Sequence, residues 1–153
     1  MRFKTIAGLL MFVATLAPAA HAQAPAGSNF QSLDAPGRAC SDMTARGTWG
    51  TVIEGAVVGS SSVFRGLDLA YLDGRGHITQ VDHFVDDGVA PTQDWTPGTG
   101  TYSVNPDCTG SAVINSGSTP YPIAFHFILV ENGKKMLQVV DANAVIAIAY
   151  RVN

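Results

Sequence analysis

Short runs of β-favouring residues, each bounded by turn residues, follow one another from residue 48 to residue 152. Turn signals such as Asp73-Gly74 and Asn132-Gly133 separate them, as in a succession of hairpins. No segment keeps a helical period over three turns, so the crossover helices of a parallel sheet are not expected. The predicted strands are 48–58, 63–72, 77–85, 100–104, 111–115, 123–130, 135–140 and 144–152.

A succession of about eight antiparallel strands either stays open with two edges or closes on itself. Closure removes the unpaired edges that promote aggregation, so we predict an all-β fold with a single antiparallel up-and-down barrel. A two-sheet β-sandwich is the alternative, because the number of strands does not exclude it.

Several of these strands are apolar on both faces. In 123–130, Phe125 and Phe127 lie on one face, whereas His126 and Ile128 lie on the other. A simple β-meander explains one apolar face only. The second face indicates either an apolar lumen or an interface with another subunit.

The N-terminus carries the features of a cleavable signal peptide. Arg2 and Lys4 form a basic start, an apolar stretch follows, and Ala20-His21-Ala22 offers a cleavage site. The apolar stretch is shorter than the roughly 20 residues that span a bilayer, so no stable membrane insertion is expected after cleavage. We therefore predict a signal peptide at 1–22, a flexible leader at 23–39 and a β-barrel domain at 40–153, exported to the periplasm or the extracellular space.

The charge of the predicted mature chain argues against nucleic acid as a partner. Once Arg2 and Lys4 are removed, seven basic and twelve acidic residues remain, and the basic ones do not cluster. The chain contains only two cysteines, Cys40 and Cys108, and in an oxidising compartment these most simply form a disulfide. The chain-entropy model gives a loop of this length about 4 kcal/mol of stabilisation.

Two segments carry a resemblance to known proteins. Residues 72–78 (LDGRGHI) and 100–110 (GTYSVNPDCTG) resemble a pattern of secreted bacterial proteins, uncharacterised members of the allene oxide cyclase barrel-like, calycin-like group that carry a GTYxVNPDCTG motif. The resemblance covers roughly residues 40–152 and implies an eight-stranded barrel with an apolar lumen. It carries over no catalytic residue, because the cyclase residues have no match here.

A weaker similarity links the two ends of the predicted barrel. Trp49 in the first strand and Arg151 in the last are similar to the way lipocalins place a tryptophan under a late arginine. We expect the arginine to pack on the indole and help close the barrel.

The second motif also has a structural explanation. Asn105-Pro106 favours a turn, Asp107 is expected to bond local amides, and Gly110 is expected to supply any left-handed residue that the turn needs. Cys108 on this turn would be tethered to Cys40.

Catalytic and metal-binding patterns are weak. None of His77, His83 and His126 has a second ligand at a metal-like spacing, so no metal site and no cofactor are predicted. The serine cluster at 59–62 lacks the frame of a hydrolase nucleophile.

Polar residues inside apolar strands are the candidates for chemistry, and they are Glu54, Asp68, Asp82, His126 and Gln138. Solvent is expected for Glu54 and Asp82. Asp68 and His126 are the catalytic candidates if they face the lumen, since an acid and a histidine together can move a proton. The predicted ligand-binding residues are Tyr71, Phe125, Phe127, His126 and Tyr150.

Three functions follow from these observations. The first is an exported barrel that binds a small apolar ligand in its lumen. The second is a cofactor-free cyclase or isomerase acting on an apolar substrate. The third is a subunit of a secreted assembly, with a homo-oligomer as one form.

Overall fold

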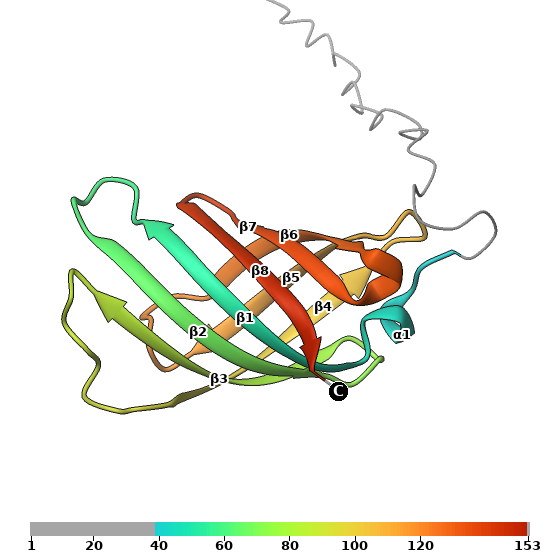
Figure 1. Cartoon of the computed structure of the whole chain (residues 1–153), viewed down its shortest axis with the longest axis horizontal. Helices are drawn as coiled ribbons and strands as arrows, with labels where there is room; N and C mark the ends of the chain where they lie inside the picture. The colour runs from blue at the N-terminus through green and yellow to red at the C-terminus, as the bar shows by residue number, and fades with distance from the viewer. Residues whose placement is uncertain (1–38, 153) are drawn as a thin grey trace, which may run out of the picture.

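A computed structural model describes residues 39–152, which form a closed barrel of eight antiparallel strands (Figure 1). Each strand pairs with its neighbour in sequence, and β8 pairs with β1 to close the barrel. The up-and-down barrel is thereby confirmed and the sandwich alternative is excluded. The predicted signal peptide at 1–22 and nearly all of the predicted leader lie outside the described residues. The elements are α1 (Asp42–Ala45), β1 (Gly47–Ala56), β2 (Val63–Leu72), β3 (His77–Asp86), β4 (Thr96–Val104), β5 (Thr109–Ser116), β6 (Ile123–Val130), the 3-10 turn η1 (Glu131–Gly133), β7 (Lys135–Val140) and β8 (Ala144–Val152).

The start of β4 differs most from the prediction. The strand begins at Thr96 rather than at residue 100, because Thr96-Pro97-Gly98 has the composition of a turn but continues the ladder with β3. Pro97 pairs with Val81, and the pairing of β4 with β5 begins one residue later, at Gly98. Pro97, which has no backbone N–H to donate, therefore lies at the end of the ladder, where a proline is tolerated.

One end of the barrel is closed by the segment that precedes β1. Figure 1 shows α1 and the C-terminal end of β8 together at this end, with the β1–β2 and β3–β4 connections at the opposite end. Arg151 packs over the Trp49 ring at 4.8 Å from its centroid, as predicted. Its guanidinium also donates hydrogen bonds to the backbone carbonyls of Thr44, Arg46 and Gly133. A single arginine thus joins α1, η1 and β8 across the closed end.

The disulfide between Cys40 and Cys108 is formed, as predicted, and fastens the segment before α1 to the β4–β5 turn. The Cys40 amide donates to the carbonyl oxygen of Pro106 at 3.1 Å, and the Val104 amide donates to Asp42 Oδ1 at 2.7 Å. Such a disulfide indicates an oxidising compartment. Within the described residues, no helix is both long and apolar enough to cross a lipid bilayer.

The β4–β5 turn corrects one detail of the prediction. Asp107 bonds a local amide, as expected, through the Thr109 N–H at 3.0 Å. The left-handed residue, however, is Cys108, with φ 68°, and not Gly110. Position 110 needs a glycine because there is no room for a side chain. A Cβ there would lie 2.6 Å from the Ser103 carbonyl oxygen and closer still to the Phe127 ring.

Gly110→Ala is therefore expected to lower the free energy of unfolding by about 1–3 kcal/mol, the usual cost of overpacking a filled interior. Ser111→Ala is the matched control, since Ser111 is exposed on the outer face of the same strand, and its change is expected to stay within about 0.5 kcal/mol. Urea unfolding of both variants measures the difference. Equal stability of the two variants would show that the Phe127 ring moves aside at no cost.

Candidate functional site

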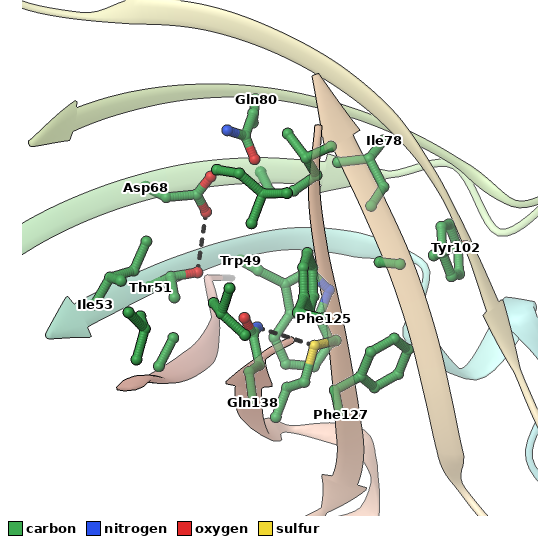
Figure 2. A pocket seen from close by; sticks show the side chains of 18 of the residues that line it. Trp49, Thr51, Ile53, Asp68, Ile78, Gln80, Tyr102, Phe125, Phe127 and Gln138 are labelled. Carbon is green, nitrogen blue, oxygen red and sulfur yellow. Dashed lines mark hydrogen bonds between the residues drawn. The ribbon is translucent and has the colours of Figure 1, made fainter. Parts of the chain in front are cut away.

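The inward-facing side chains leave a cavity of about 180 Å³ inside the barrel (Figure 2). All eight strands contribute to its wall, and most of the lining side chains are aliphatic or aromatic. An apolar cavity of roughly 150 Å³ is large enough to bind benzene. The lumen therefore has room for a small molecule with one aromatic ring.

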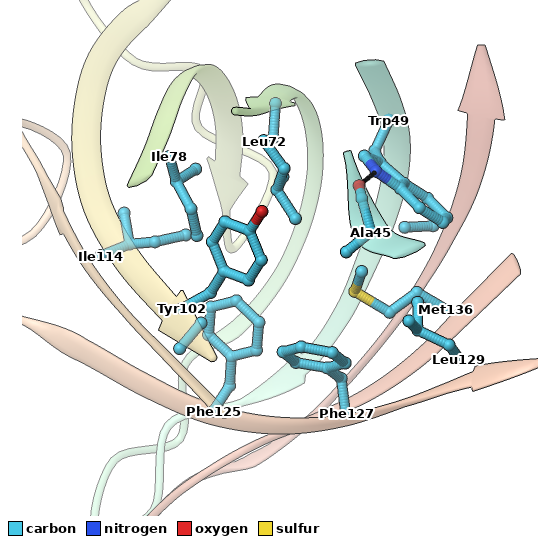
Figure 3. Packing of buried hydrophobic residues seen from close by; sticks show 13 residues of the cluster. Ala45, Trp49, Leu72, Ile78, Tyr102, Ile114, Phe125, Phe127, Leu129 and Met136 are labelled. Carbon is cyan, nitrogen blue, oxygen red and sulfur yellow. Dashed lines mark hydrogen bonds between the residues drawn. The ribbon is translucent and has the colours of Figure 1, made fainter. Parts of the chain in front are cut away.

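The floor of the cavity is a packed hydrophobic cluster at the closed end that includes the rings of Trp49 and Tyr102 (Figure 3). Trp49 is 1% exposed, and its indole N–H donates to the Ala45 carbonyl at 2.8 Å. The Tyr102 hydroxyl accepts a hydrogen bond from the Gly74 amide at 2.9 Å and donates to the Asp42 carbonyl. Burial raises the pKa of Tyr102 above its usual range. Both polar atoms are thus used by the protein itself, and the floor offers no free donor to a ligand.

The opposite end of the cavity is lined by residues from the connections between strands. Val57, Thr119 and Asn143 come from the β1–β2, β5–β6 and β7–β8 connections, and Phe64 and Phe84 lie at the neighbouring strand ends. Loops are held less firmly than strands, so the lumen opens more easily at this end than at the closed end.

One side of the wall is polar. Asp68 on β2 projects into the lumen and accepts a hydrogen bond from Thr51 Oγ1 on β1 at 3.0 Å (Figure 2). Burial raises the pKa of Asp68 from 3.8 to about 7; the Thr51 hydrogen bond opposes this rise, and the negative charge of Asp82 adds to it. The lumen therefore carries a titratable group whose protonation changes near neutral pH.

Asp82 corrects a prediction. It was expected in solvent, as was Glu54, but only Glu54 is exposed. Asp82 is 1% exposed and receives hydrogen bonds from Gln80 Nε2 at 3.0 Å and from Ser116 Oγ at 2.5 Å. It faces inward because Ile78, Gln80 and Asp82 alternate along β3 on the side that faces the lumen.

The structure brings together only some of the predicted site residues. Phe125, Phe127 and Asp68 all line the cavity, as does Gln138. The two phenylalanines come from β6 and stand at its inner face, with ring centroids 6.4 Å apart.

His126, Tyr71 and Tyr150 do not lie in the lumen, which corrects the expectation that they line it. Strand alternation places His126 on the face of β6 opposite the two phenylalanines, where its side chain is 65% exposed. Its Nδ1 lies 2.9 Å from Asp141 Oδ1. Tyr71 and Tyr150 are exposed on the outer faces of β2 and β8. Asp68 and His126 therefore do not share a site.

The two other histidines of the described residues form hydrogen bonds at the surface. His77 Nδ1 lies 3.0 Å from Asp73 Oδ2, and His83 Nδ1 lies 2.5 Å from the Asp94 carbonyl oxygen. Among residues 39–152, no three side chains of His, Cys, Asp or Glu form a group that could hold a metal ion.

The second apolar face of the strands lies on the outside of the barrel. Val52 on β1 is directly opposite Leu67 on β2 and Ile148 on β8, and Leu69 and Tyr150 flank Gly50 in the same way. Four of these five large side chains, all except Ile148, are about half exposed. The two-sided apolar pattern in the sequence thus has two sources, a lumen and an apolar outer face over β8, β1 and β2.

Thr51, Gln80 and Asp82 were not predicted as part of a polar site in the lumen. The sequence contained a signal for two of them. Gln80 and Asp82 lie on the same face of their strand as Ile78 and Phe84, the bulkiest apolar residues of that strand. For Thr51 no local signal exists, since it stands out only by its place beside Asp68 on the next strand.

No protein-family model matches the chain, and a search of curated proteins found no match. The resemblance to the allene oxide cyclase group therefore stays a prediction, and the geometry of the lumen is the basis for proposing a function.

Proposed function

We propose that this protein binds a small apolar molecule inside its barrel, outside the cytoplasm, in the periplasm or the extracellular space. The observation that carries the proposal is the apolar cavity of about 180 Å³, closed at one end and lined by loop residues at the other. A concave, mostly apolar site with a few polar groups is the usual form of a small-molecule site. The disulfide supports the location, because such bonds persist in oxidising compartments.

The proposal is tested by filling the lumen. Ala147 is buried on the inner face of β8, whereas its neighbour Ile146 is exposed on the outer face. Ala147→Phe is expected to weaken the binding of propylbenzene at least about ten-fold, and Ile146→Phe is expected to leave it within about two-fold. Binding is measured by titration calorimetry and by the change in tryptophan emission, to which Trp49 in the cavity floor contributes.

Circular dichroism shows whether both variants fold, and Ala112→Leu, on the wall formed by β5, replaces Ala147→Phe if that variant does not. Two results contradict the proposal. One is an absence of saturable binding by the wild-type protein, and the other is an equal affinity of the inward and outward variants.

A cofactor-free cyclase or isomerase is the second candidate, and the position of Asp68 favours it. A lumen carboxyl with a pKa of about 7 is suited to donate or accept a proton near neutral pH. With His126 outside, Asp68 would act with Thr51 alone as its hydrogen-bond partner. Turnover that survives in Asp68→Asn would exclude this role.

The third candidate, a subunit of a secreted assembly, rests on the apolar outer face over β8, β1 and β2. A second copy of this chain is the occupant that such a face implies. Light scattering at micromolar concentration decides between the possibilities, since the molar mass of a single chain contradicts assembly.

A further inference from the structure

The polar side of the barrel wall contains two carboxylates on paired positions of neighbouring strands. Asp68 on β2 and Asp82 on β3 are directly opposite one another in the antiparallel ladder, and Gln80 precedes Asp82 on the same inner face. Asp68 and Gln80 are each 9% exposed, and Asp82 is 1% exposed. We refer to Asp68, Gln80 and Asp82 as the acceptor cluster.

The hydrogen bonds of the acceptor cluster leave two buried acceptor atoms without a donor. Gln80 Nε2 and Ser116 Oγ both donate to Asp82 Oδ2, and Thr51 Oγ1 donates to Asp68 Oδ1. Gln80 Oε1 and Asp82 Oδ1 are buried without a partner. The donation to Asp82 fixes the orientation of the Gln80 amide, because the reverse orientation would set two acceptors against each other. A buried polar atom without a partner costs free energy, so the cluster lacks a donor.

The Gln80 oxygen is directed towards the lumen. In Figure 2 it points towards the other side chains that line the cavity, and the amide nitrogen points to the side. Asp68 and Gln80 line the cavity, whereas Asp82 lies behind them. A group inside the lumen therefore reaches the Asp68 carboxylate and lies beside the Gln80 side chain, whose oxygen is buried in the ligand-free barrel and must rotate to accept a hydrogen bond from that group.

A proton on Asp68 does not complete this site. It supplies one donor, whereas the Gln80 oxygen and the Asp82 Oδ1 atom both lack one. The described residues that line the cavity include no lysine, arginine or histidine. Above about pH 7, where Asp68 is ionised, the cluster therefore carries negative charge with no cation among the lining residues to balance it, which is costly in a buried site.

We propose that the acceptor cluster binds the ammonium group of a small primary amine whose apolar body, such as one aromatic ring, fills the lumen. This inference rests on the proposed function and names its ligand class. An ammonium group supplies three hydrogen-bond donors and one positive charge, which the cluster lacks. Hydrogen bonds that involve ionised groups are roughly twice as strong as neutral ones. The apolar floor of Trp49, Phe125 and Phe127 accommodates the rest of the molecule.

The test compares three probes of nearly the same shape at about pH 8, where the Asp68 carboxylate is ionised. They are 2-phenylethylamine, its neutral isostere propylbenzene and the anion 3-phenylpropionate. The amine is expected to bind at least about ten-fold more tightly than propylbenzene, and the anion is expected not to bind measurably. Titration calorimetry gives all three affinities.

Asp68→Asn is expected to remove the preference for the amine, lowering its affinity at least about ten-fold while the affinity for propylbenzene stays within about two-fold. Glu54→Gln is the matched control, because it removes one carboxylate from the outer face of the barrel wall. It is expected to leave both affinities unchanged. If Asp68→Asn does not fold, the comparison of the three probes on the wild-type protein decides alone.

The outcomes separate the two proposals. Binding of propylbenzene with no preference for the amine overturns this inference and leaves the apolar lumen site standing. Equal loss of amine binding in Asp68→Asn and Glu54→Gln also overturns it, since the effect then comes from net charge. Failure of both propylbenzene and the amine to bind overturns the lumen site itself.

Discussion

Replacing Asp68 by asparagine is expected to raise the free energy of unfolding by up to about 4 kcal/mol at pH 8 and by less than about 1 kcal/mol at pH 4. The pKa of Asp68 rises from 3.8 to about 7 in the folded protein, chiefly because of burial. Each unit between the folded and unfolded pKa is worth about 1.4 kcal/mol. The asparagine keeps the acceptor for Thr51 but carries no charge, so it avoids the cost of ionisation inside the barrel.

The direction of the pH dependence follows from which state holds the proton. Below pH 3.8 the Asp68 carboxyl is protonated in both states, and burial costs nothing extra. Between pH 3.8 and about 7 the unfolded chain releases the proton while the folded protein retains it, so the wild-type protein loses stability as the pH rises. Above about pH 7 both states are ionised and the loss is constant.

Urea unfolding of the wild-type protein, Asp68→Asn and Glu54→Gln at about pH 4, 6 and 8 measures this difference. Other acidic groups titrate in all three proteins, so the difference between wild type and Asp68→Asn isolates Asp68. Glu54→Gln is expected to stay close to wild type throughout, because Glu54 is exposed. An Asp68→Asn variant that is less stable than wild type at pH 8 would contradict the prediction, since the carboxylate would then have a stabilising partner within the protein.

A gain in stability on losing Asp68 would also bear on function. Residues that lower the stability of the folded state are commonly found at binding and catalytic sites. Asp68 has this character in the ligand-free lumen, and a ligand cation would offset its cost. A neutral side chain would serve the barrel better, so the charge is more readily explained by what the lumen binds than by what holds the strands together.

The order and number of the strands follow from the sequence because alternation and turn residues are local signals. Residues 63–72, 123–130, 135–140 and 144–152 were predicted with the bounds that the structure has. Closure into a barrel was also predictable, since it removes the two unpaired edges that an open succession of eight strands would leave. The short helix α1 was missed, because four residues are too few to show a helical period.

The contents of the lumen were harder to predict because both faces of the strands are apolar. Alternation shows that His126 and Phe125 face opposite ways, but it does not show which of the two faces inward. The inner face is the one with the larger aromatic side chains in β6, and the outer face keeps His126 beside Asp141. The pairing of Asp68 with Asp82 depends on the register of β2 against β3, which no local signal in either strand contains.

The closed end of the barrel leads to the second large effect. Trp49→Ala is expected to lower the free energy of unfolding by about 3–5 kcal/mol, the range for removing a large buried aromatic side chain. The indole is 1% exposed and forms part of the cavity wall. Its loss also leaves the Ala45 carbonyl without its donor and removes the ring on which Arg151 packs.

Trp95→Ala is the matched control, since Trp95 is the only other tryptophan and is 48% exposed before β4. Its effect is expected to stay within about 1 kcal/mol. Trp49→Phe keeps an aromatic ring and loses the indole hydrogen bond, so we expect it to fall between the two. Denaturant unfolding followed by far-ultraviolet circular dichroism compares all three variants without relying on tryptophan emission. Equal losses of unfolding free energy in Trp49→Ala and Trp95→Ala would show that the closed end does not depend on the indole. The cavity would then lack the rigid floor on which ligand binding in the lumen depends.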